Sequence, residues 1–342
     1  MKGELLGVID ATTGENSLEE LLTHRSLAAL PFGGRYRLID FILSSMTNSG
    51  IGSVAIFPKY QYRSLMDHLG SGKNWDLDRK RDGLFFFPSP SLELDDNKIG
   101  AFDHFALHLD YFKRSKQPYA FISNCFTVCN LSIQPILRQH QKSACDVTEI
   151  RKDGRSLDMY IVKTSLLIDL VENRQETGYT CMRDVVLDLR HDYHICPYET
   201  TNYAKRIDSI QTYYEANKEL LTSTLYPQLF SDKQPIFTKV KDEPPTQYGV
   251  NAVVKNSLIA NGCVIEGTVE NSIIFRAVKI GKGVVVKDSI IMQKSQLLEG
   301  ARVENAILDK DVKIGTNENL LGLPDDLIII PKGATQGVVP AR

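Results

Sequence analysis

A degenerate repeat near the C-terminal end constrains the fold of this chain more than any other feature. Four related motifs, NSLI, NSII, DSII and NAIL, begin at Asn256, Asn271, Asp288 and Asn305, so they recur at spacings of 15, 17 and 17 residues. Valine and isoleucine recur between them, with glycine at corner positions. An aliphatic period of about six residues, with roughly 18 residues per coil, is typical of a β-helix whose coils bury aliphatic side chains against their neighbours. A β-sandwich would instead show alternating polar and apolar strands without a fixed repeat. We therefore predict a left-handed parallel β-helix of hexapeptide repeats over residues 251–342.

The first two thirds of the chain alternate strand-like and helix-like segments. Apolar runs predict strands, and helical spacing of apolar residues predicts helices. Such alternation favours an α/β fold, here a Rossmann-like domain over residues 1–238 with a mostly parallel sheet and helices on both faces. Pro244 and Pro245 would stop a helix or a central strand, so residues 239–250 are expected to be a linker. The strands are expected at 5–9, 53–57, 119–122, 146–150 and 159–163, and the helices at 36–46, 105–113 and 166–172.

Composition excludes several classes of function. The chain has 342 residues and a formal net charge of −2, which creates no broad field for attracting nucleic acid or anionic lipid. No apolar run approaches the roughly 20 residues that cross a bilayer, and the N-terminal segment lacks the cleavage site of a signal peptide. The six cysteines are scattered without a CxxC pair, so we expect a cytoplasmic protein with reduced thiols and no metal site.

Three segments carry a resemblance to a known family. Residues 24–51, HRSLAALPFGGRYRLIDFILSSMTNSGI, resemble the first sequence block of glucose-1-phosphate adenylyltransferases, RAKPAVPFGGKYRLIDFxLSNxxNSGI. Residues 60–78 (YQYRSLMDHLGSGKNWDLD) and 213–220 (YYEANKEL) resemble two further blocks. The family also joins its first domain to a β-helix, so the resemblance runs along the whole chain. It implies a nucleotidyltransferase fold, and catalytic members make ADP-glucose and pyrophosphate from ATP and glucose 1-phosphate.

The chain departs from the family where the phosphates of the nucleotide bind. The family begins with GGxGTRLxxLTxxRAKP, a glycine-rich turn whose backbone approaches the phosphates because glycine lacks a Cβ. Counted back without gaps from Arg25, the matching positions here lose three glycines, an arginine and a lysine, and they gain an acid. The residues at these positions are Thr12, Thr13, Glu15, Ser17 and Leu27.

The carboxylates that the resemblance implies as Mg²⁺ ligands are also replaced. The family segment GDHIYKMDY corresponds to SNCFTVCNL, which puts Asn124 and Asn130 in place of two aspartates. The segment YWRDVGTxxxYWEAN corresponds to YAKRIDSIQTYYEAN, which puts Arg206 in place of a third. Nucleotidyl transfer uses Mg²⁺ to neutralise phosphate charge and to orient the attacking group. We therefore expect no catalytic residues, and no metal or cofactor bound by this chain.

Some matching residues remain candidates for binding a ligand or effector. The resemblance places His24 and Arg25 where the family binds anionic sugar-phosphate activators. It places Gly33, Gly34 and Arg35 in the tight turn of the first block. That block equally fits a purely structural role, because its glycines form a turn and its apolar side chains pack a helix. The candidates are His24, Arg25, Gly33, Gly34, Arg35, Lys59, Gly100 and Asp103.

The resemblance is to the shorter, D-type subunit that some bacteria encode beside the catalytic subunit. It implies a regulatory or stabilising subunit for glycogen biosynthesis that is inactive or very weak by itself. The expected partner is a catalytic subunit that uses Mg²⁺, within a heterotetramer, and a homo-oligomer of the chain alone stays open. A sugar-phosphate effector is a further expected ligand, whereas nucleic acid and membranes are not.

Two other functions stay open. A slow but genuine adenylyltransferase would need rebuilt ligands, for which Asp103, Asp208 and Glu215 are the nearby acids. A binding subunit would instead sense a sugar phosphate or nucleotide. An acyltransferase is disfavoured, because those β-helix enzymes usually carry a histidine on their coils and no histidine follows His194.

Overall fold

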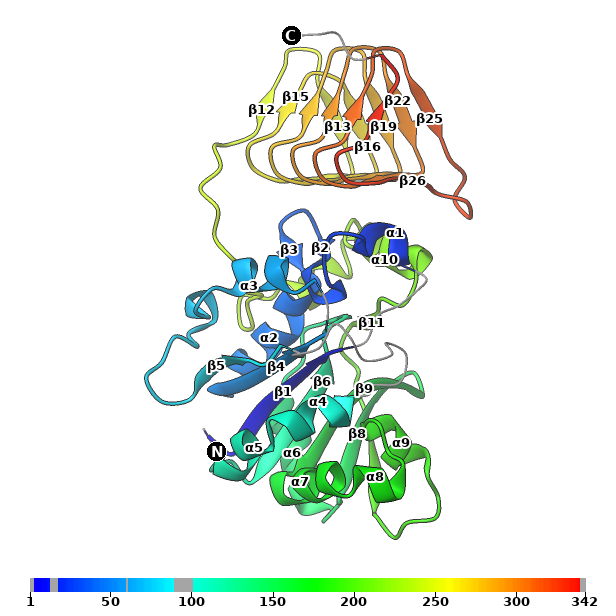
Figure 1. The fold of residues 1–342 in the computed structure, drawn as a ribbon. Coiled ribbons are helices and arrows are strands. Elements are labelled where there is room, and N and C mark those ends of the chain that lie inside the picture. Colours follow the sequence, from blue (N-terminus) through cyan, green and yellow to red (C-terminus); the bar gives the residue numbers. More distant parts are fainter. Residues whose placement is uncertain (1–2, 13–17, 60, 89–100, 339–342) are drawn as a thin grey trace.

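The computed structural model describes residues 3–12, 18–59, 61–88 and 101–338. It shows a layered α/β part with a parallel β-helix stacked on it (Figure 1). Four of the residues singled out above, Thr13, Glu15, Ser17 and Gly100, lie outside the described residues. Within the described part of the chain, no helix has the length and apolar character needed to span a membrane.

The α/β part is built on a seven-stranded sheet in the order β10-β8-β9-β6-β1-β4-β5. Neighbours run parallel except at β9, which is antiparallel to β6 and β8. The predicted mostly parallel sheet is confirmed. Strand β9 departs from it because a two-residue connection joins β8 to β9, and so short a connection closes a hairpin rather than a crossover. The strands are β1 (Leu5–Ala11), β4 (Ser53–Pro58), β5 (Gly83–Phe86), β6 (Tyr119–Asn124), β8 (Val147–Lys152), β9 (Arg155–Lys163) and β10 (Ile195–Glu199).

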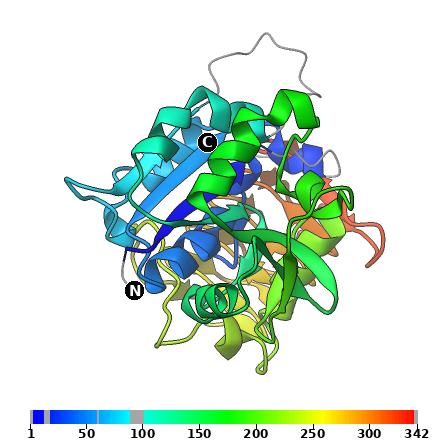
Figure 2. The ribbon, with the colours of Figure 1, turned by 90° about the horizontal axis from the view of Figure 1, so that it is seen from below.

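Both faces of this sheet are buried. In β1, Leu5 and Ile9 point into one hydrophobic core, and Leu6 and Val8 point into the other. A strand covered on both faces needs apolar residues at successive positions, which explains the unbroken run at the start of the chain. The helices lie in layers on either side of the sheet (Figure 2). One core contains residues of α2 (Leu38–Asn48), α6 (Ile133–Lys142) and α10 (Ile210–Glu219), and the other contains residues of α4 (Ala101–Leu107), α5 (Leu109–Arg114), α7 (Thr164–Glu172) and α9 (Met182–Leu187).

Smaller elements complete the α/β part. Two short two-stranded sheets pair β2 with β3 and β7 with β11. The remaining elements are α1 (Glu19–Leu22), η2 (Leu27–Ala29), β2 (Pro31–Phe32), β3 (Tyr36–Arg37), α3 (Arg63–Leu69), η3 (Lys73–Trp75), β7 (Thr127–Cys129), α8 (Arg174–Thr177), β11 (Ala204–Arg206) and α11 (Tyr226–Leu229).

Two local expectations are wrong. The single helix expected at 105–113 is divided at His108, whose φ of −125° and ψ of 29° interrupt the helical backbone between α4 and α5. The expectation that every cysteine is a free thiol also fails, because Cys145 and Cys196 form a disulfide. These two residues are far apart in sequence, and the parallel pairing of β8 with β10 brings them together.

The β-helix consists of three lateral sheets in which every strand pairs in parallel with the strand one coil away. The register advances by 17 residues between most coils, as in Val285↔Arg302. Its first strand, β12, lies inside the segment expected to be a linker, because it pairs with β15. The strands are β12 (Gln247–Tyr248), β13 (Val253–Lys255), β14 (Leu258–Ile259), β15 (Val264–Ile265), β16 (Thr268–Glu270), β17 (Ile273–Ile274), β18 (Lys279–Ile280), β19 (Val285–Lys287), β20 (Ile290–Ile291), β21 (Gln296–Leu297), β22 (Arg302–Glu304), β23 (Ala306–Leu308), β24 (Lys313–Ile314), β25 (Asn319–Leu321), β26 (Ile328–Ile330) and β27 (Thr335–Gln336).

A column of serine hydroxyls connects successive coils at the repeat motifs. Ser272 Oγ donates to the carbonyl of Glu270 at 2.7 Å and accepts the backbone N–H of Ser289 at 3.1 Å. Ser289 repeats the arrangement with the N–H of Ala306 at 3.2 Å. The first residue of each motif has a positive φ, as in Asn271 at 48°, a conformation that asparagine and aspartate tolerate better than most residues. The motifs therefore recur because each one turns a corner and bonds to the next coil.

The sheet that carries the motifs packs against the α/β part. The third motif residue, as in Ile273 and Ile290, belongs to the core that also contains α2, α6 and α10. The fourth, as in Ile274 and Ile291, points into the β-helix. Because neighbouring strand residues face opposite ways, one sheet can serve both cores.

A buried ion pair links the two parts. The Arg25 guanidinium donates to both carboxylate oxygens of Asp309 at 2.9 Å, with side-chain exposures of 2% and 3%. Arg25 also donates to the carbonyl of Leu21 at 3.1 Å. Nearby, Tyr214 Oη donates to the carbonyl of Asp288 at 2.7 Å. Hence the β-helix and the α/β part share polar contacts as well as an apolar core.

We predict that Arg25→Met lowers the free energy of unfolding by about 3–5 kcal/mol, because it leaves the Asp309 carboxylate buried without its partner. Urea unfolding followed by circular dichroism and by tyrosine fluorescence measures the loss. The double variant Arg25→Met/Asp309→Leu should recover most of it. The matched control is Arg302→Met, which removes an exposed arginine near Glu304 and should cost less than about 1 kcal/mol. Equal losses for Arg25→Met and Arg302→Met would contradict the assignment.

Candidate functional site

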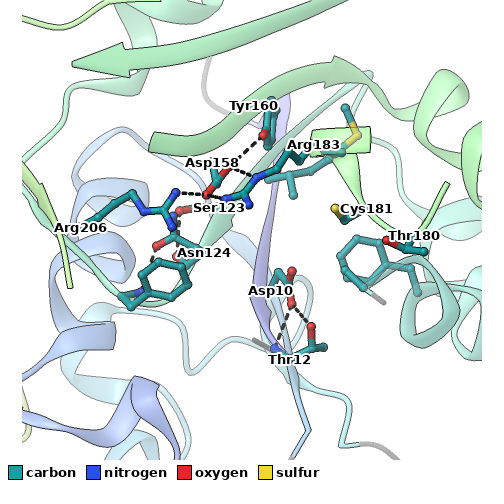
Figure 3. Close-up of a pocket in the computed structure, with 15 residues that line it drawn as sticks. Asp10, Thr12, Ser123, Asn124, Asp158, Tyr160, Thr180, Cys181, Arg183 and Arg206 are labelled. Carbon is teal, nitrogen blue, oxygen red and sulfur yellow. Dashed lines mark hydrogen bonds and ion pairs between the residues drawn. The ribbon is translucent and has the colours of Figure 1, made fainter. Parts of the chain in front are cut away.

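A cavity of about 270 Å³ opens at the carboxyl ends of the parallel strands β1 and β6 (Figure 3). In open α/β sheets this edge is where ligands bind. Strand β9 and the start of α9 form the opposite wall. The residues that line it are Asp10, Thr12, Ala101, Phe105, Ile122, Ser123, Asn124, Phe126, Asp158, Tyr160, Thr180, Cys181, Met182, Arg183 and Arg206.

Asp10 ends the buried part of β1 and faces this cavity. Its carboxylate accepts the backbone N–H of Thr12 at 2.9 Å and the Thr12 hydroxyl at 2.6 Å. Burial raises the pKa of Asp10, the two bonds from Thr12 oppose that shift, and the nearby charge of Asp158 adds to it. The threonine therefore serves as an internal partner for a carboxylate.

Asn124 forms hydrogen bonds to its own chain through both the nitrogen and the oxygen of its side chain. Its amide nitrogen donates to the carbonyl of Leu157 at 2.6 Å. Its amide oxygen accepts the backbone N–H of Phe126 at 3.0 Å and the hydroxyl of Thr127 at 2.9 Å. The side chain thus ties the end of β6 to β9, and its oxygen already has two donors.

Two arginines converge on one carboxylate inside the cavity. Arg183 Nε donates to Asp158 Oδ1 at 3.0 Å, and its second nitrogen contacts Asp158 Oδ2. Arg206 reaches the same Oδ2 from β11 at 2.5 Å (Figure 3). The hydrogen bond to Asp158 raises the pKa of Arg183. Across these three residues, two positive charges meet one negative charge, so the cluster has a net positive charge.

A second cavity, of about 210 Å³, lies between the β2–β3 turn and the corners of the β-helix. Burial and the nearby arginines lower the pKa of Lys310 to about 7, and burial lowers that of Arg37 to about 10. Burial is the largest cause of both shifts, and the neighbouring arginines lower both pKa values further. The cations that line it are Arg35, Arg37, Lys241, Arg276, Lys294 and Lys310, the acids are Glu243 and Asp311, and the remaining lining residues are Tyr36, His68, Ala277 and Gln293.

Comparison with known proteins gives the relationships of the chain. A family model described as nucleotidyl transferase matches residues 18–158, and one described as GlmU-like, C-terminal hexapeptide, matches residues 244–323. A glycogen biosynthesis protein GlgD from Bacillus subtilis (strain 168) is 54% identical over 334 residues, which cover 98% of this chain and 97% of that relative. One from Geobacillus stearothermophilus is 57% identical over 343 residues, with 100% of each chain covered. A glucose-1-phosphate adenylyltransferase from Thermomicrobium roseum is 31% identical over 348 residues, with 90% and 81% covered.

The chain belongs to the GlgD group of the glucose-1-phosphate adenylyltransferase family. The names of these relatives place the group in glycogen biosynthesis. Three of the residues that depart from the family pattern, Thr12, Asn124 and Arg206, line the same cavity, although they come from three separate segments. Leu27 is buried in the core instead. Asn130 lies outside the cavity lining and donates to the carbonyls of Leu229 and Gln234, both at 2.8 Å.

The candidate ligand residues of the GlgD-type chain fall in several places. Arg25 is held by Asp309, whereas His24 beside it is exposed. Asp103 accepts a hydrogen bond from Arg174 at 2.7 Å, away from the cavity lining. Lys59 lies directly after β4 and already interacts with another group of the chain.

The turn of the first block has a structural position. Gly33 and Gly34 have φ values of 57° and 83°, so an L-residue would be strained there. Gly33 donates its N–H to Asn217 Oδ1 at 3.0 Å. Arg35, beside them, lines the second cavity.

Asp10 and Asp158 are the acids that sequence reasoning missed. Both side chains are carboxylates, and they are the acids among the described residues that line the first cavity. The acids considered from the sequence lie elsewhere: Asp208 lines a neighbouring cavity, and Glu215 forms an ion pair with Lys205. An acid at the carboxyl end of a buried strand is a signal that could have revealed Asp10. Asp158 offers no such signal, because its role depends on two arginines from distant segments.

We predict that Asn124→Asp lowers the free energy of unfolding by about 1–3 kcal/mol, because a carboxylate oxygen would then face the Leu157 carbonyl without a hydrogen to share. Chemical denaturation measures this. The matched control is Asn251→Asp at an exposed position, which should leave stability unchanged. A stability gain for Asn124→Asp, or tight Mg²⁺ binding by that variant, would contradict the assigned hydrogen bonds.

Proposed function

We propose that this chain is a non-catalytic subunit that regulates or stabilises glucose-1-phosphate adenylyltransferase in glycogen biosynthesis. Its partner would be the catalytic subunit, which uses Mg²⁺ to make ADP-glucose and pyrophosphate from ATP and glucose 1-phosphate. The family relationship supports a role in glycogen biosynthesis, and the chemistry of the first cavity supports the proposal that this chain is not catalytic.

The observation that carries this proposal is the Asp158 cluster. Mg²⁺ prefers carboxylate and water oxygens and usually binds through one or two carboxylates. Here the Asp158 carboxylate is already shared by Arg183 and Arg206. The Asp10 carboxylate accepts two hydrogen bonds from Thr12, and the Asn124 oxygen accepts two from Phe126 and Thr127. This donor set does not fit Mg²⁺, so no catalytic step is assigned to the cavity.

The free faces of the β-helix suit subunit contact. One lateral sheet already packs on the α/β part, so the other two face outward (Figure 1). Large apolar residues are exposed on the β-helix at Tyr248, Val250, Leu321 and Leu323. A stable subunit interface of this kind buries roughly 2,000 Å² or more. We propose that the heterotetramer uses these faces, and that the catalytic subunit gains activity because this chain binds its active conformation more tightly.

We predict that the chain co-purifies with the catalytic subunit of the same organism, makes no ADP-glucose alone, and changes the kcat, KM or effector response of the mixture. Coupled assays of pyrophosphate release on each chain and on the mixture measure this. A mixture that behaves like the catalytic chain by itself would overturn the regulatory proposal. ADP-glucose formation by this chain alone, lost in Asp10→Asn, would support the slow enzyme instead.

A second role is favoured by the cationic cavity. Its six cations face two acids, and the pKa of Lys310 is lowered mainly by burial and further by Arg37 and Arg25. An anionic ligand such as a sugar bisphosphate or a nucleotide would neutralise the excess of cations. We propose that a regulatory subunit of this kind senses such a ligand between its two parts, where binding can alter how the β-helix sits on the α/β part.

We predict that fructose 1,6-bisphosphate or ATP binds here and that affinity falls about tenfold between pH 7 and pH 8.5, measured by calorimetry. The sign follows from Lys310, which is charged below its pKa of about 7 and loses that charge as the pH rises through it. Lys310→Met should weaken binding and flatten the profile, whereas the exposed Lys313→Met should not. A pH profile that Lys310→Met leaves unchanged would contradict the role of this lysine.

A further inference from the structure

Two cysteines and a histidine meet at the outer edge of the sheet. Strand β10 pairs in parallel with β8, so the residues that precede the two strands lie side by side. His194 and Cys196 come from the start of β10, and Cys145 comes just before β8. The backbone N–H of Asp146 donates to the carbonyl of His194 at 3.0 Å, and the N–H of His194 donates back to Asp146 Oδ2 at 2.9 Å. These bonds hold the two segments in a fixed register.

The three side chains present their ligand atoms to one another. Cys145 Sγ, Cys196 Sγ and His194 Nε2 all lie within 4.8 Å. The distance from Cys196 Sγ to His194 Nε2 is 3.8 Å. In a tetrahedral zinc site, bond lengths of about 2.3 Å to sulfur and 2.0 Å to nitrogen put these two atoms about 3.5 Å apart. The spacing between Cys196 and His194 therefore needs little change to accommodate the ion, whereas the two sulfur atoms, which are bonded here, would have to separate to about 3.8 Å after reduction.

The sulfur atoms are joined as a disulfide, with their Cα atoms 6.0 Å apart. We propose that reduction of this disulfide creates a site for Zn²⁺ whose ligands are Cys145, His194 and Cys196. Thiolate and imidazole are the ligands that zinc takes most readily in proteins. The two states use the same sulfur atoms, so the disulfide and the metal site exclude each other.

The reaction balances with a phosphine as the reductant. The phosphine gives two electrons and becomes its oxide, water supplies the oxygen and two protons, and the disulfide becomes two thiols. Zn²⁺ then displaces both thiol protons and binds two thiolates and a neutral imidazole. The resulting centre has no net formal charge, which favours it at a site where Cys145 is buried.

The differing exposure of the ligands predicts an open coordination position. Cys145 is buried, Cys196 is half-buried and His194 is exposed. Three protein ligands leave the fourth position on the solvent side, as in zinc sites that bind water or an incoming group. The site also fastens β10, whose preceding segment begins at α9 and carries Arg183.

The test uses the purified full chain and Co²⁺, whose thiolate complexes have a charge-transfer absorption band. After reduction by a phosphine and removal of the excess, the wild type should bind one Co²⁺ per chain with this band, and Zn²⁺ should displace it. The oxidised wild type should show no band. Cys196→Ser should abolish the band, and His194→Ala should weaken Co²⁺ binding about tenfold or more.

The matched control is Cys263→Ser, because this thiol donates to the Phe275 carbonyl in the β-helix and a hydroxyl can do the same. It should keep the band. His194 is exposed, so its alanine variant tests the site even if loss of a cysteine impairs folding. A reduced wild type without the band, or equal Co²⁺ affinity in His194→Ala and wild type, would overturn the proposal. Since none of these readouts involves ADP-glucose, the result is independent of the regulatory role.

Discussion

The contact between Arg25 and Asp309 is the interaction on which the arrangement of the two parts depends. A charge that is nearly inaccessible to water needs a partner of opposite sign with good geometry, and each residue is the partner of the other across the junction. The pair also contributes to the electrostatics beside it. Burial lowers the pKa of the adjacent Lys310 most, Arg37 and Arg25 lower it further, and Asp309, the partner of Arg25, opposes the shift. The same interaction thus orients the β-helix and influences the charge of a lysine beside it.

In the first cavity, too, polar and charged side chains are paired with other groups of the same chain. Where the family pattern leads one to expect groups that hold a nucleotide and a metal ion, this chain satisfies its polar groups from within. Thr12 bonds to Asp10, Asn124 bonds to β9, and two arginines hold Asp158. The Thr12 bond is local to the end of β1, whereas the Asn124 and Asp158 contacts join different elements around the cavity. Asn124 thus ties β6 to β9, and the two arginines tie α9 and β11 to β9.

Much of the fold could be predicted from the sequence, because its patterns are local. The aliphatic repeat predicts the coils, and the alternation of segments predicts the sheet with its two layers of helices. The direction of β9 was not predicted, since it depends on the two-residue connection before it. At the site, the substituted positions Thr12, Asn124 and Arg206 were found by comparison of motifs, and they share one cavity. Asp158 was not found because its partners Arg183 and Arg206 come from distant segments, α9 and β11. The group formed by Cys145, His194 and Cys196 was not found because it depends on the pairing of β8 with the distant strand β10.

The serine column has a consequence for how chains of this type can change in length. Every hydroxyl in it bonds backward to its own strand and is bonded by the strand that follows, so each coil presents the same connection to the next. Removal or duplication of a whole coil would preserve these bonds, and a difference in coil length also preserves them, because the spacing is 15 residues from Ser257 to Ser272 and 17 residues from Ser272 to Ser289. The β-helix is therefore modular: evolution can adjust its height in whole coils, and the number of residues in each coil can vary, as it does between Val253↔Thr268 and Val285↔Arg302.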